Sequence, residues 1–261
     1  MIDQYINEGY VIVKNLLPTT LVDKIHQEIE TIVNKWYSKG AKYYDTVSQY
    51  KNEKNSFWIV NNRLLEEAFI QHCSIQEIIN TACKLMDTGG VSVLEDQFIN
   101  KPPGCIGVNM HQDTSYFPLT KESKCITCWI PLCDLDEKLG PLIIYPGSHK
   151  YGTALPVENL HENSDGNDLL KQIDSEAPFI EPITLNVQKG DVVFFDCNVI
   201  HGSGINQSNL WRPAFSLHYA SEESVFVEAK AKQNACPEIY EGIKNGSQPV
   251  TNKNIQFFKK N

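Results

Sequence analysis

The chain has 261 residues, of which 41% are hydrophobic and 21% are charged, a composition typical of a globular protein whose length one compact core can still support. Its formal net charge of −9 would repel a phosphate backbone, and no local cluster of Lys and Arg compensates for that charge. A nucleic-acid partner is therefore not expected.

No apolar run in the sequence is long enough to span a bilayer, and the residues from Met1 to Gln4 show neither the basic nor the apolar segment of a signal peptide. The eight cysteines are irregularly spaced, which does not indicate a disulfide framework. These features predict a cytoplasmic protein without a membrane partner, in which most cysteines are small buried hydrophobic side chains.

Two helices are predicted before the main β region. A short strand at 10–13 is followed by a helix that opens with Thr20 as N-cap and whose apolar residues recur with a 3.6-residue period. A second helix opens on the capping box at 74–77 and ends at the two glycines at 89–90.

From residue 91 onward the pattern changes to short apolar or alternating runs separated by Gly and Pro turns, which is typical of a β-sandwich or barrel. The predicted strands lie at 91–100, 125–132, 142–145, 183–187, 192–195 and 214–220.

These elements predict a single domain over 1–261. It has a helical flank at about 18–90, a β core at about 91–220 and a C-terminal extension at 221–261. The stretch at about 152–182 has weak periodicity and is predicted to be a long insertion between strands. Insertions of this kind are often active-site lids.

One pair of residues suggests a metal site. His111 and Asp113 are two residues apart, a spacing that in a β-strand directs both side chains to the same face. His201 lies much later, inside a Gly-rich turn that allows close backbone approach. Two imidazoles and one carboxylate on one side of an octahedral metal leave open positions, as a non-haem iron(II) oxygenase needs. A lone His-x-Asp is more often structural, so this pattern by itself indicates only a possible site.

Arg212 adds weight to the metal hypothesis. It follows His201 at a distance that suits a strand, a turn and the next strand, and it precedes the alternating run at 214–219. An arginine at the start of an inward-facing strand offers the planar fork that binds a carboxylate through two hydrogen bonds. The alternative is a surface ion pair.

Several segments, in this order and spacing, resemble the phytanoyl-CoA dioxygenase family from about residue 4 to about residue 220. The segments that carry the resemblance are 8–15 at the first strand, Ile99-Asn100-Lys101-Pro102-Pro103, His111-Gln112-Asp113, Tyr116-Phe117-Pro118, Gly140-Pro141-Leu142, Pro146 to Lys150, Gly190 to Phe195 and His201 to Asn206. The resemblance implies a mainly β protein with flanking helices and a double-stranded β-helix core, also called a jelly roll and cupin-like.

The resemblance also implies iron(II) as cofactor, with 2-oxoglutarate and O2 as co-substrates. The matching metal ligands are His111, Asp113 and His201, and no further catalytic residue is expected beyond that centre. Around 2-oxoglutarate, Arg212 matches the arginine for the distal carboxylate, Ser203 and Trp129 flank it, Gln97 resembles a position at the iron-binding end, and Thr127 shares a strand face with Trp129. Halogenating relatives replace the carboxylate ligand with Gly or Ala, so Asp113 favours hydroxylation, with desaturation, epoxidation or rearrangement left open.

Two further features have weaker interpretations. Cys125 and Cys128 form a CxxC, but no second ligand pair accompanies it and the two side chains point to opposite faces of a strand. Tyr116 and Phe117 closely follow the first two metal ligands and are candidates to line a substrate pocket, although ordinary core aromatics are an equal alternative.

The function predicted from the sequence is an iron(II)- and 2-oxoglutarate-dependent dioxygenase that oxidises a C–H bond of a small metabolite or natural-product intermediate. The first alternative is 2-hydroxylation of an acyl-CoA, which the acidic composition does not favour because no basic patch meets a CoA diphosphate. Alternatives of other classes are a non-catalytic jelly-roll binding protein and a zinc or nickel hydrolase on a similar barrel. The sequence does not indicate the oligomeric state.

Overall fold

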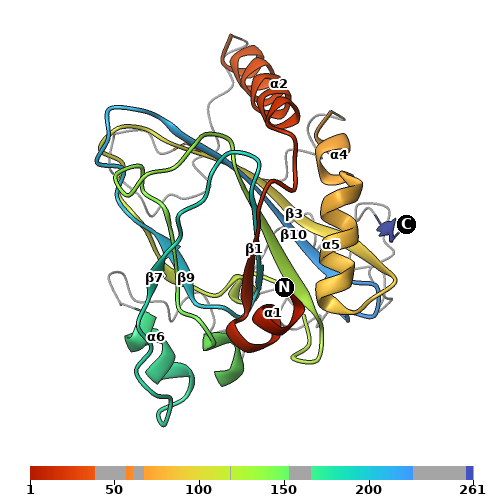
Figure 1. Cartoon of the computed structure of the whole chain (residues 1–261), viewed down its shortest axis with the longest axis vertical. Helices are drawn as coiled ribbons and strands as arrows, with labels where there is room; N and C mark the ends of the chain where they lie inside the picture. Colours follow the sequence, from red (N-terminus) through yellow and green to blue (C-terminus); the bar gives the residue numbers. More distant parts are fainter. Residues whose placement is uncertain (39–56, 61–67, 118, 153–165, 226–256, 261) are drawn as a thin grey trace.

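The computed structural model describes residues 1–38, 57–60, 68–117, 119–152, 166–225 and 257–260, and two β-sheets dominate this part of the chain (Figure 1). The seven-stranded sheet has the order β1 (Tyr10–Val13), β8 (Val192–Asp196), β5 (Cys125–Pro131), β10 (Arg212–Ser221), β3 (Gly90–Lys101) and β11 (Phe257–Lys259), and β2 (Phe57–Val60) also pairs with β3.

The second sheet has four strands in the order β4 (Val108–His111), β9 (His201–Ser203), β6 (Leu142–Ile144) and β7 (Ile183–Thr184). All the strand pairs of both sheets are antiparallel. Two curled antiparallel sheets of this kind form the double-stranded β-helix, so the predicted jelly-roll core with flanking helices is confirmed.

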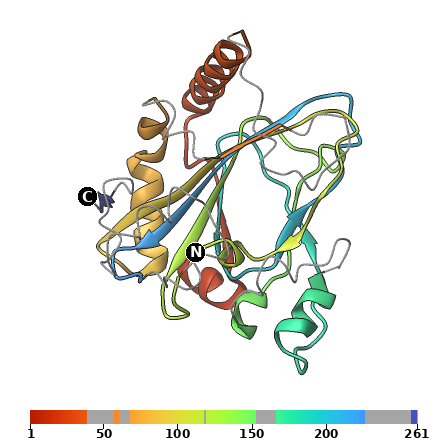
Figure 2. The same ribbon diagram turned by 180° about the vertical axis from the view of Figure 1, so that it is seen from behind.

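The two faces of the large sheet have different partners. Its outer face packs against α1 (Ile2–Glu8), α2 (Thr19–Ser38), α4 (Ala68–Cys73) and α5 (Gln76–Met86), which share one hydrophobic cluster with the sheet. Both views show α5 running along β3 and β10 (Figures 1 and 2). The inner face meets the small sheet through a second cluster that includes Trp129, Phe195 and Ile144.

Strand β10 shows this division most clearly, because all its residues are buried. Phe215, Leu217 and Tyr219 belong to the outer cluster, whereas the residues that alternate with them face the inside of the jelly roll. The alternating pattern at 214–219 therefore marks a strand with one apolar face and one face available for function.

The helix boundaries differ in detail from the predicted ones. Helix α2 begins at Thr19, and the carbonyl of Pro18 accepts from the N–H groups of Leu21 and Val22, so Thr20 is not its N-cap. The predicted capping box at the start of α5 is wrong as well. The Ser74 hydroxyl donates to the carbonyl of Gln71 at 3.0 Å, and no side chain among the described residues accepts from the first N–H groups of the helix.

The end of α5 also differs from the prediction. Asp87, in the left-handed conformation with φ 50°, ends the helix before the two glycines are reached, and Gly90 begins β3. Helix α1 was not predicted, because it is short and buries only Tyr5. Strand β7 covers only Ile183–Thr184 of the predicted run at 183–187.

Part of the predicted insertion at 152–182 lies within the residues that the structure describes. The 3-10 helix η2 (Ser148–Tyr151) precedes it, and α6 (Gly166–Ile173) packs in a cluster with Tyr145 and Ile200. Residues 153–165 lie outside the described residues, so a role of 152–182 as an active-site lid stays a prediction. Most of the C-terminal extension is likewise outside them, apart from residues 221–225 and the edge strand β11 with Lys260. No helix within the described ranges is long and apolar enough to cross a membrane.

Candidate metal centre and co-substrate site

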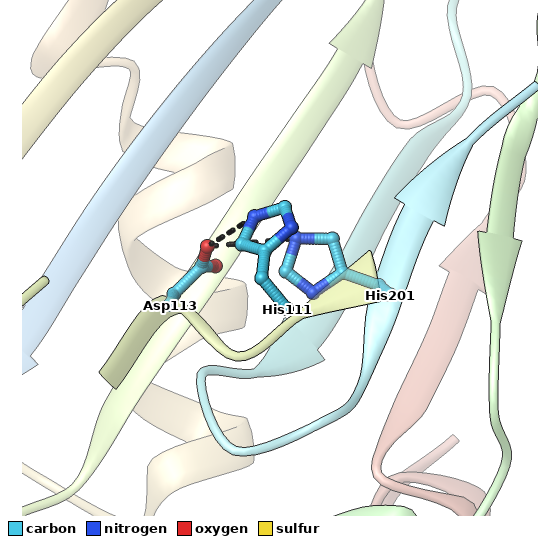
Figure 3. A group of neighbouring side chains, drawn as sticks. All are labelled: His111, Asp113 and His201. Carbon is cyan, nitrogen blue, oxygen red and sulfur yellow. Dashed lines mark ion pairs between the residues drawn. The ribbon is translucent and has the colours of Figure 1, made fainter. Parts of the chain in front are cut away.

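The side chains of His111, Asp113 and His201 converge between the two sheets (Figure 3). Their potential ligand atoms all lie within 4.8 Å of one another. Nε2 of His111 and Nε2 of His201 each lie 3.5 Å from Oδ1 of Asp113. This arrangement presents two nitrogens and one oxygen to a common point.

Backbone carbonyls fix which nitrogen each histidine offers. Nδ1 of His111 lies 2.8 Å from the carbonyl oxygen of Asn109, and Nδ1 of His201 lies 3.0 Å from that of Val199. Because a carbonyl only accepts, each Nδ1 carries the proton and each Nε2 keeps its lone pair for a metal. Burial also lowers the pKa of His201 to about 4, which keeps this imidazole neutral near pH 7.

The chain reaches this geometry differently from the prediction. Strand β4 ends at His111, and Asp113 is the first residue of the 3-10 helix η1 (Asp113–Ser115), so the two ligands do not share a strand face. His201 lies on β9, where a turn was expected. Gly202 permits that strand pairing, since a Cβ there would come within 2.6 Å of the Val108 carbonyl oxygen.

The second carboxylate oxygen of Asp113 is held by the large sheet. The Thr127 hydroxyl donates to Oδ2, and Nε2 of His218 lies 3.5 Å from the same atom. Although burial acts to raise it, the neighbouring imidazoles of His201 and His218 hold the pKa of Asp113 well below its usual value. Asp113 is therefore an anion with Oδ1 facing the two histidines, which is the form that binds a divalent cation.

The donor set fits iron(II). Two imidazole nitrogens and one carboxylate oxygen on one side of the ion form the 2-His-1-carboxylate arrangement of non-haem iron(II) oxygenases. All three residues come from segments that both sheets hold in place, which orients the ligands before metal binds.

Arg212 is a buried cation with no ion-pair partner among the described residues. Its side chain is 2% exposed, and its Nε and Nη1 atoms have no hydrogen-bond partner. The guanidinium carbon lies 5.6 Å from the centre of the Trp129 ring, and burial lowers the pKa of Arg212 to about 10, so the group remains charged near pH 7. A planar, charged, unsatisfied guanidinium on an inner face fits the distal carboxylate of 2-oxoglutarate.

Ser203 lies at the same end of the jelly roll, on β9. Its hydroxyl oxygen accepts a hydrogen bond of 2.7 Å from Nζ of Lys101, which also donates to the carbonyl of Gly204 at 2.8 Å. Lys101 is opposite Arg212 in the β3–β10 ladder. Sequence reasoning did not single out Lys101, because a lysine before two prolines resembles a surface turn.

Two other predicted co-substrate residues lie further along the same inner face. Gln97 and Trp129 are both opposite Ser216 in β10, and the Gln97 side chain donates to Glu95. The contact of Thr127 is with Asp113, which gives it a role beside a metal ligand. Contacts of Gln97 and Thr127 with 2-oxoglutarate stay predictions.

The two aromatic residues proposed for the substrate pocket differ in exposure. The Tyr116 side chain is 41% exposed, and its ring meets the ring of His111 edge-on at 5.8 Å. Phe117 is 3% exposed and packs against the ring of His218 at 5.2 Å. Tyr116 is thus the one with surface available beside the metal centre.

The CxxC pair is divided between the faces of β5. Cys128 belongs to the outer hydrophobic cluster, whereas Cys125 is next to Cys197 of the neighbouring chain segment. All seven cysteines among the described residues are free thiols. No metal-ligand group within the described ranges includes a cysteine.

A jelly-roll core that carries this triad, together with a buried unpaired arginine on the same interior, defines the class of iron(II)- and 2-oxoglutarate-dependent dioxygenases. The family model described as phytanoyl-CoA dioxygenase (PhyH) matches residues 5–214, and the chain therefore belongs to the phytanoyl-CoA dioxygenase family.

Among its relatives, the peroxisomal phytanoyl-CoA dioxygenase of Bos taurus is 26% identical over 268 residues, which cover 98% of this chain and 79% of that protein. The ectoine dioxygenase of Bordetella parapertussis is 30% identical over 127 residues, which cover 44% of this chain and 40% of that protein.

Solved structures share the fold. The non-heme alpha ketoglutarate dependent carbocyclase SnoK from nogalamycin biosynthesis superposes with a TM-score of 0.74 at 20% identity, over 99% of this chain and 95% of that chain. EctD from S. alaskensis with bound Fe superposes with a TM-score of 0.68 at 17% identity, over 87% of this chain and 77% of that chain.

Proposed function

We propose that this protein holds iron(II) through His111, Asp113 and His201 and 2-oxoglutarate through Arg212 and Ser203, and hydroxylates a C–H bond of a small metabolite or natural-product intermediate. The observation that carries the proposal is the pairing of the triad with an unsatisfied, buried guanidinium on the inner face of β10. A zinc or nickel hydrolase has no use for that arginine, and a non-catalytic binding protein has no need for the complete triad.

When bound, iron(II) with 2-oxoglutarate and O2 supplies the oxidation: one oxygen atom enters the substrate as a hydroxyl, the other enters succinate, and CO2 leaves. The protein supplies placement and a dry interior. Arg212 and Ser203 would hold the distal carboxylate, and the carbonyls of Asn109 and Val199 keep the two histidines in the metal-binding tautomer.

A small-molecule substrate is supported by the structural neighbours. The epimerase SnoN was solved in complex with Fe3+, alpha ketoglutarate and nogalamycin RO, and EctD with 2-oxoglutarate and 5-hydroxyectoine. We further propose a single domain over 1–261, a substrate pocket bordered by Tyr116 with Phe117 behind it, and a cytoplasmic location. The free thiols of the described cysteines suit a reducing compartment.

A second candidate substrate is an acyl-CoA, hydroxylated at its 2-position. The likeness to phytanoyl-CoA dioxygenases along 98% of the chain favours it. The net charge of −9 does not, because a CoA diphosphate needs basic groups near the pocket mouth.

Anaerobic titration with iron(II) and 2-oxoglutarate tests the reaction class. A visible metal-to-ligand charge-transfer band is expected only when both are present, because only a chelated 2-oxo acid gives it. His111→Ala should abolish the band and succinate release, whereas His26→Ala, a change on α2 far from the triad in sequence, should leave both intact. A wild-type protein that takes up iron(II) without developing the band contradicts the proposal.

A succinate-release screen then separates the substrate candidates. Acyl-CoAs, the corresponding free acids, amino acids and secondary metabolites are compared at equal concentration. Substrate-dependent succinate with free metabolites and none with acyl-CoAs supports the first candidate, and the reverse supports the second.

A further inference from the structure

Lys101 is unusually buried for a lysine. It is the last residue of β3, and its side chain is only 2% exposed. Lysines are almost never fully buried unless they are paired with an acid. No acidic side chain within the described ranges lies at ion-pair distance from Lys101; its ammonium donates only to the neutral oxygens of Ser203 and Gly204.

A second buried cation stands beside it. Arg212 is opposite Lys101 in the strand ladder and leaves Nε and Nη1 unsatisfied. Two buried positive charges without a negative partner are costly, since each loses its hydration and they repel each other. Burial, followed by the charge of Arg212, lowers the pKa of Lys101 to about 7. An anion between these groups would satisfy both.

The hydrogen bond from Lys101 also determines what Ser203 can do. An ammonium group only donates, so it occupies a lone pair of the Ser203 oxygen at 2.7 Å. The single hydroxyl proton of Ser203 cannot return to Lys101 and must point to another acceptor. A carboxylate held by Arg212 is such an acceptor.

We propose that Lys101 is a positioning residue of the 2-oxoglutarate site: its ammonium fixes Ser203 as a hydrogen-bond donor and adds to Arg212 a second positive charge that selects a 2-oxo acid with a distal carboxylate. This inference rests on the proposed function. It assigns to Lys101 no contact with the iron-binding end of the co-substrate.

The test compares Lys101→Met, which removes both charge and hydrogen bonds, with Lys101→Gln, which keeps a neutral donor. Lys84→Met, an exposed change on α5, is the matched control. The dissociation constant of 2-oxoglutarate is measured from the charge-transfer band under anaerobic conditions. Iron(II) affinity is measured separately without 2-oxoglutarate.

Lys101→Met is expected to raise the dissociation constant of 2-oxoglutarate by about 10- to 100-fold, the effect of losing charge-assisted hydrogen bonds. Lys101→Gln should fall between this variant and the wild type. Iron(II) affinity and the binding of 2-oxobutyrate, which lacks a distal carboxylate, should stay within about twofold of wild type, because neither depends on this end of the site.

A pH series gives a further readout. The groups facing Lys101 are Arg212 on β10, which lowers its pKa, and Cys105 after β3, which raises it. Because the ammonium form is needed, the affinity of the wild type for 2-oxoglutarate should fall as pH rises above about 7, and the affinity of Lys101→Met should not follow that curve.

The possible results separate the inference from the function on which it rests. If the wild type shows no charge-transfer band at saturating 2-oxoglutarate, the proposed function fails. If the wild type shows the band and Lys101→Met binds 2-oxoglutarate equally well, only the role of Lys101 is wrong. An equal loss of 2-oxobutyrate or iron(II) binding in both Lys101 variants also overturns it, since that indicates general damage to the site.

Discussion

His218 places its Nε2 atom 3.5 Å from Oδ2 of Asp113, on the carboxylate oxygen that the ligand histidines do not approach. Thr127 donates to that same oxygen from the neighbouring strand β5, and Thr127 and His218 are paired in the β5–β10 ladder. The large sheet therefore orients the carboxylate, while η1 and the small sheet supply the ligands themselves.

Thr127→Val should weaken iron(II) binding by about 10- to 100-fold, the range seen when outer partners of metal ligands are removed. Valine has nearly the same shape, so the change removes a hydrogen bond without opening a cavity. Iron(II) affinity by competition with a chromophoric chelator measures the effect. Thr184→Val, on the exposed edge strand β7, is the control, and equal affinities for both variants would refute a role for Thr127.

Gln112, between the two ligands of the His-x-Asp pair, should contribute to stability instead of chemistry. Its buried amide donates to the carbonyls of Gly152 at 3.1 Å and Asn198 at 2.6 Å. Gln112→Glu keeps the shape of the side chain but replaces the donating amide nitrogen with a carboxylate oxygen. The carbonyls of Gly152 and Asn198 then lose their hydrogen-bond donor. The free energy of unfolding should fall by about 1–3 kcal/mol per carbonyl left unpaired, as read from urea denaturation.

The control for this prediction is Gln207→Glu, at an exposed position with the same side-chain amide. It should change the free energy of unfolding by less than about 0.5 kcal/mol. Gln112→Glu with wild-type stability would show that these two hydrogen bonds do not hold the start of the insertion.

Asp191, directly before β8, forms hydrogen bonds with the residues that follow β1. Its contribution to the free energy of unfolding should depend on pH. Its carboxylate accepts from the backbone N–H of Asn15 at 2.9 Å and of Gln188 at 3.0 Å, and from Lys14 at 2.8 Å. Despite the opposing effect of burial, these bonds, led by that from Lys14, lower its pKa in the folded state.

A lowered folded-state pKa means that the stabilisation is complete above the unfolded value of about 3.9 and is lost as pH falls through the folded value. Asp191→Asn should therefore cost about 1–3 kcal/mol in urea denaturation between pH 5 and 8, and the difference from wild type should shrink below about pH 4. Lys14→Met should cost less than Asp191→Asn, because the Lys14 side chain is 56% exposed and the two backbone N–H groups still donate to the carboxylate. A difference that is independent of pH would contradict the assignment.

The docking of α6 depends on close contact between Gly166 and Tyr145. The Gly166 N–H donates to the Tyr145 hydroxyl at 3.0 Å, and a Cβ at Gly166 would lie 2.2 Å from the Tyr145 ring. Gly166→Ala should displace the start of α6 and increase its amide hydrogen exchange. Tyr145→Phe should lose about 0.5–1.5 kcal/mol, one buried hydrogen bond. Unchanged exchange in both variants would show that α6 docks through other contacts.

The sequence predicted the architecture well where periodicity is strong. The alternation at 214–219 located β10 and its two faces, and the run at 91–100 located β3, because a strand that packs one face against an apolar cluster repeats its apolar side chains every two residues. The same period passes through Arg212 and His218, and through Gln97 and Lys101. The period places Lys101 on the inner face of β3, but its position opposite Arg212 depends on the register between β3 and β10, which periodicity does not encode.

The local geometry of the metal centre was harder to predict from the sequence. The chain leaves the strand at His111 and turns before Asp113, and the short β9 exists only because β4 and β6 pair with it. Both features depend on tertiary contacts between segments far apart in the sequence. Helix α1 escaped detection for a related reason, since its stability comes from one buried tyrosine and not from an amphipathic pattern.

Because β10 uses one face for the hydrophobic cluster and the other for Arg212 and His218, a shift of its register by one residue would exchange the two sets completely. An insertion or deletion within β10 would therefore turn Arg212 or His218 away from the interior, whereas a substitution in place would not. A change of substrate is therefore expected to come from the connecting segments, such as the one that carries Tyr116.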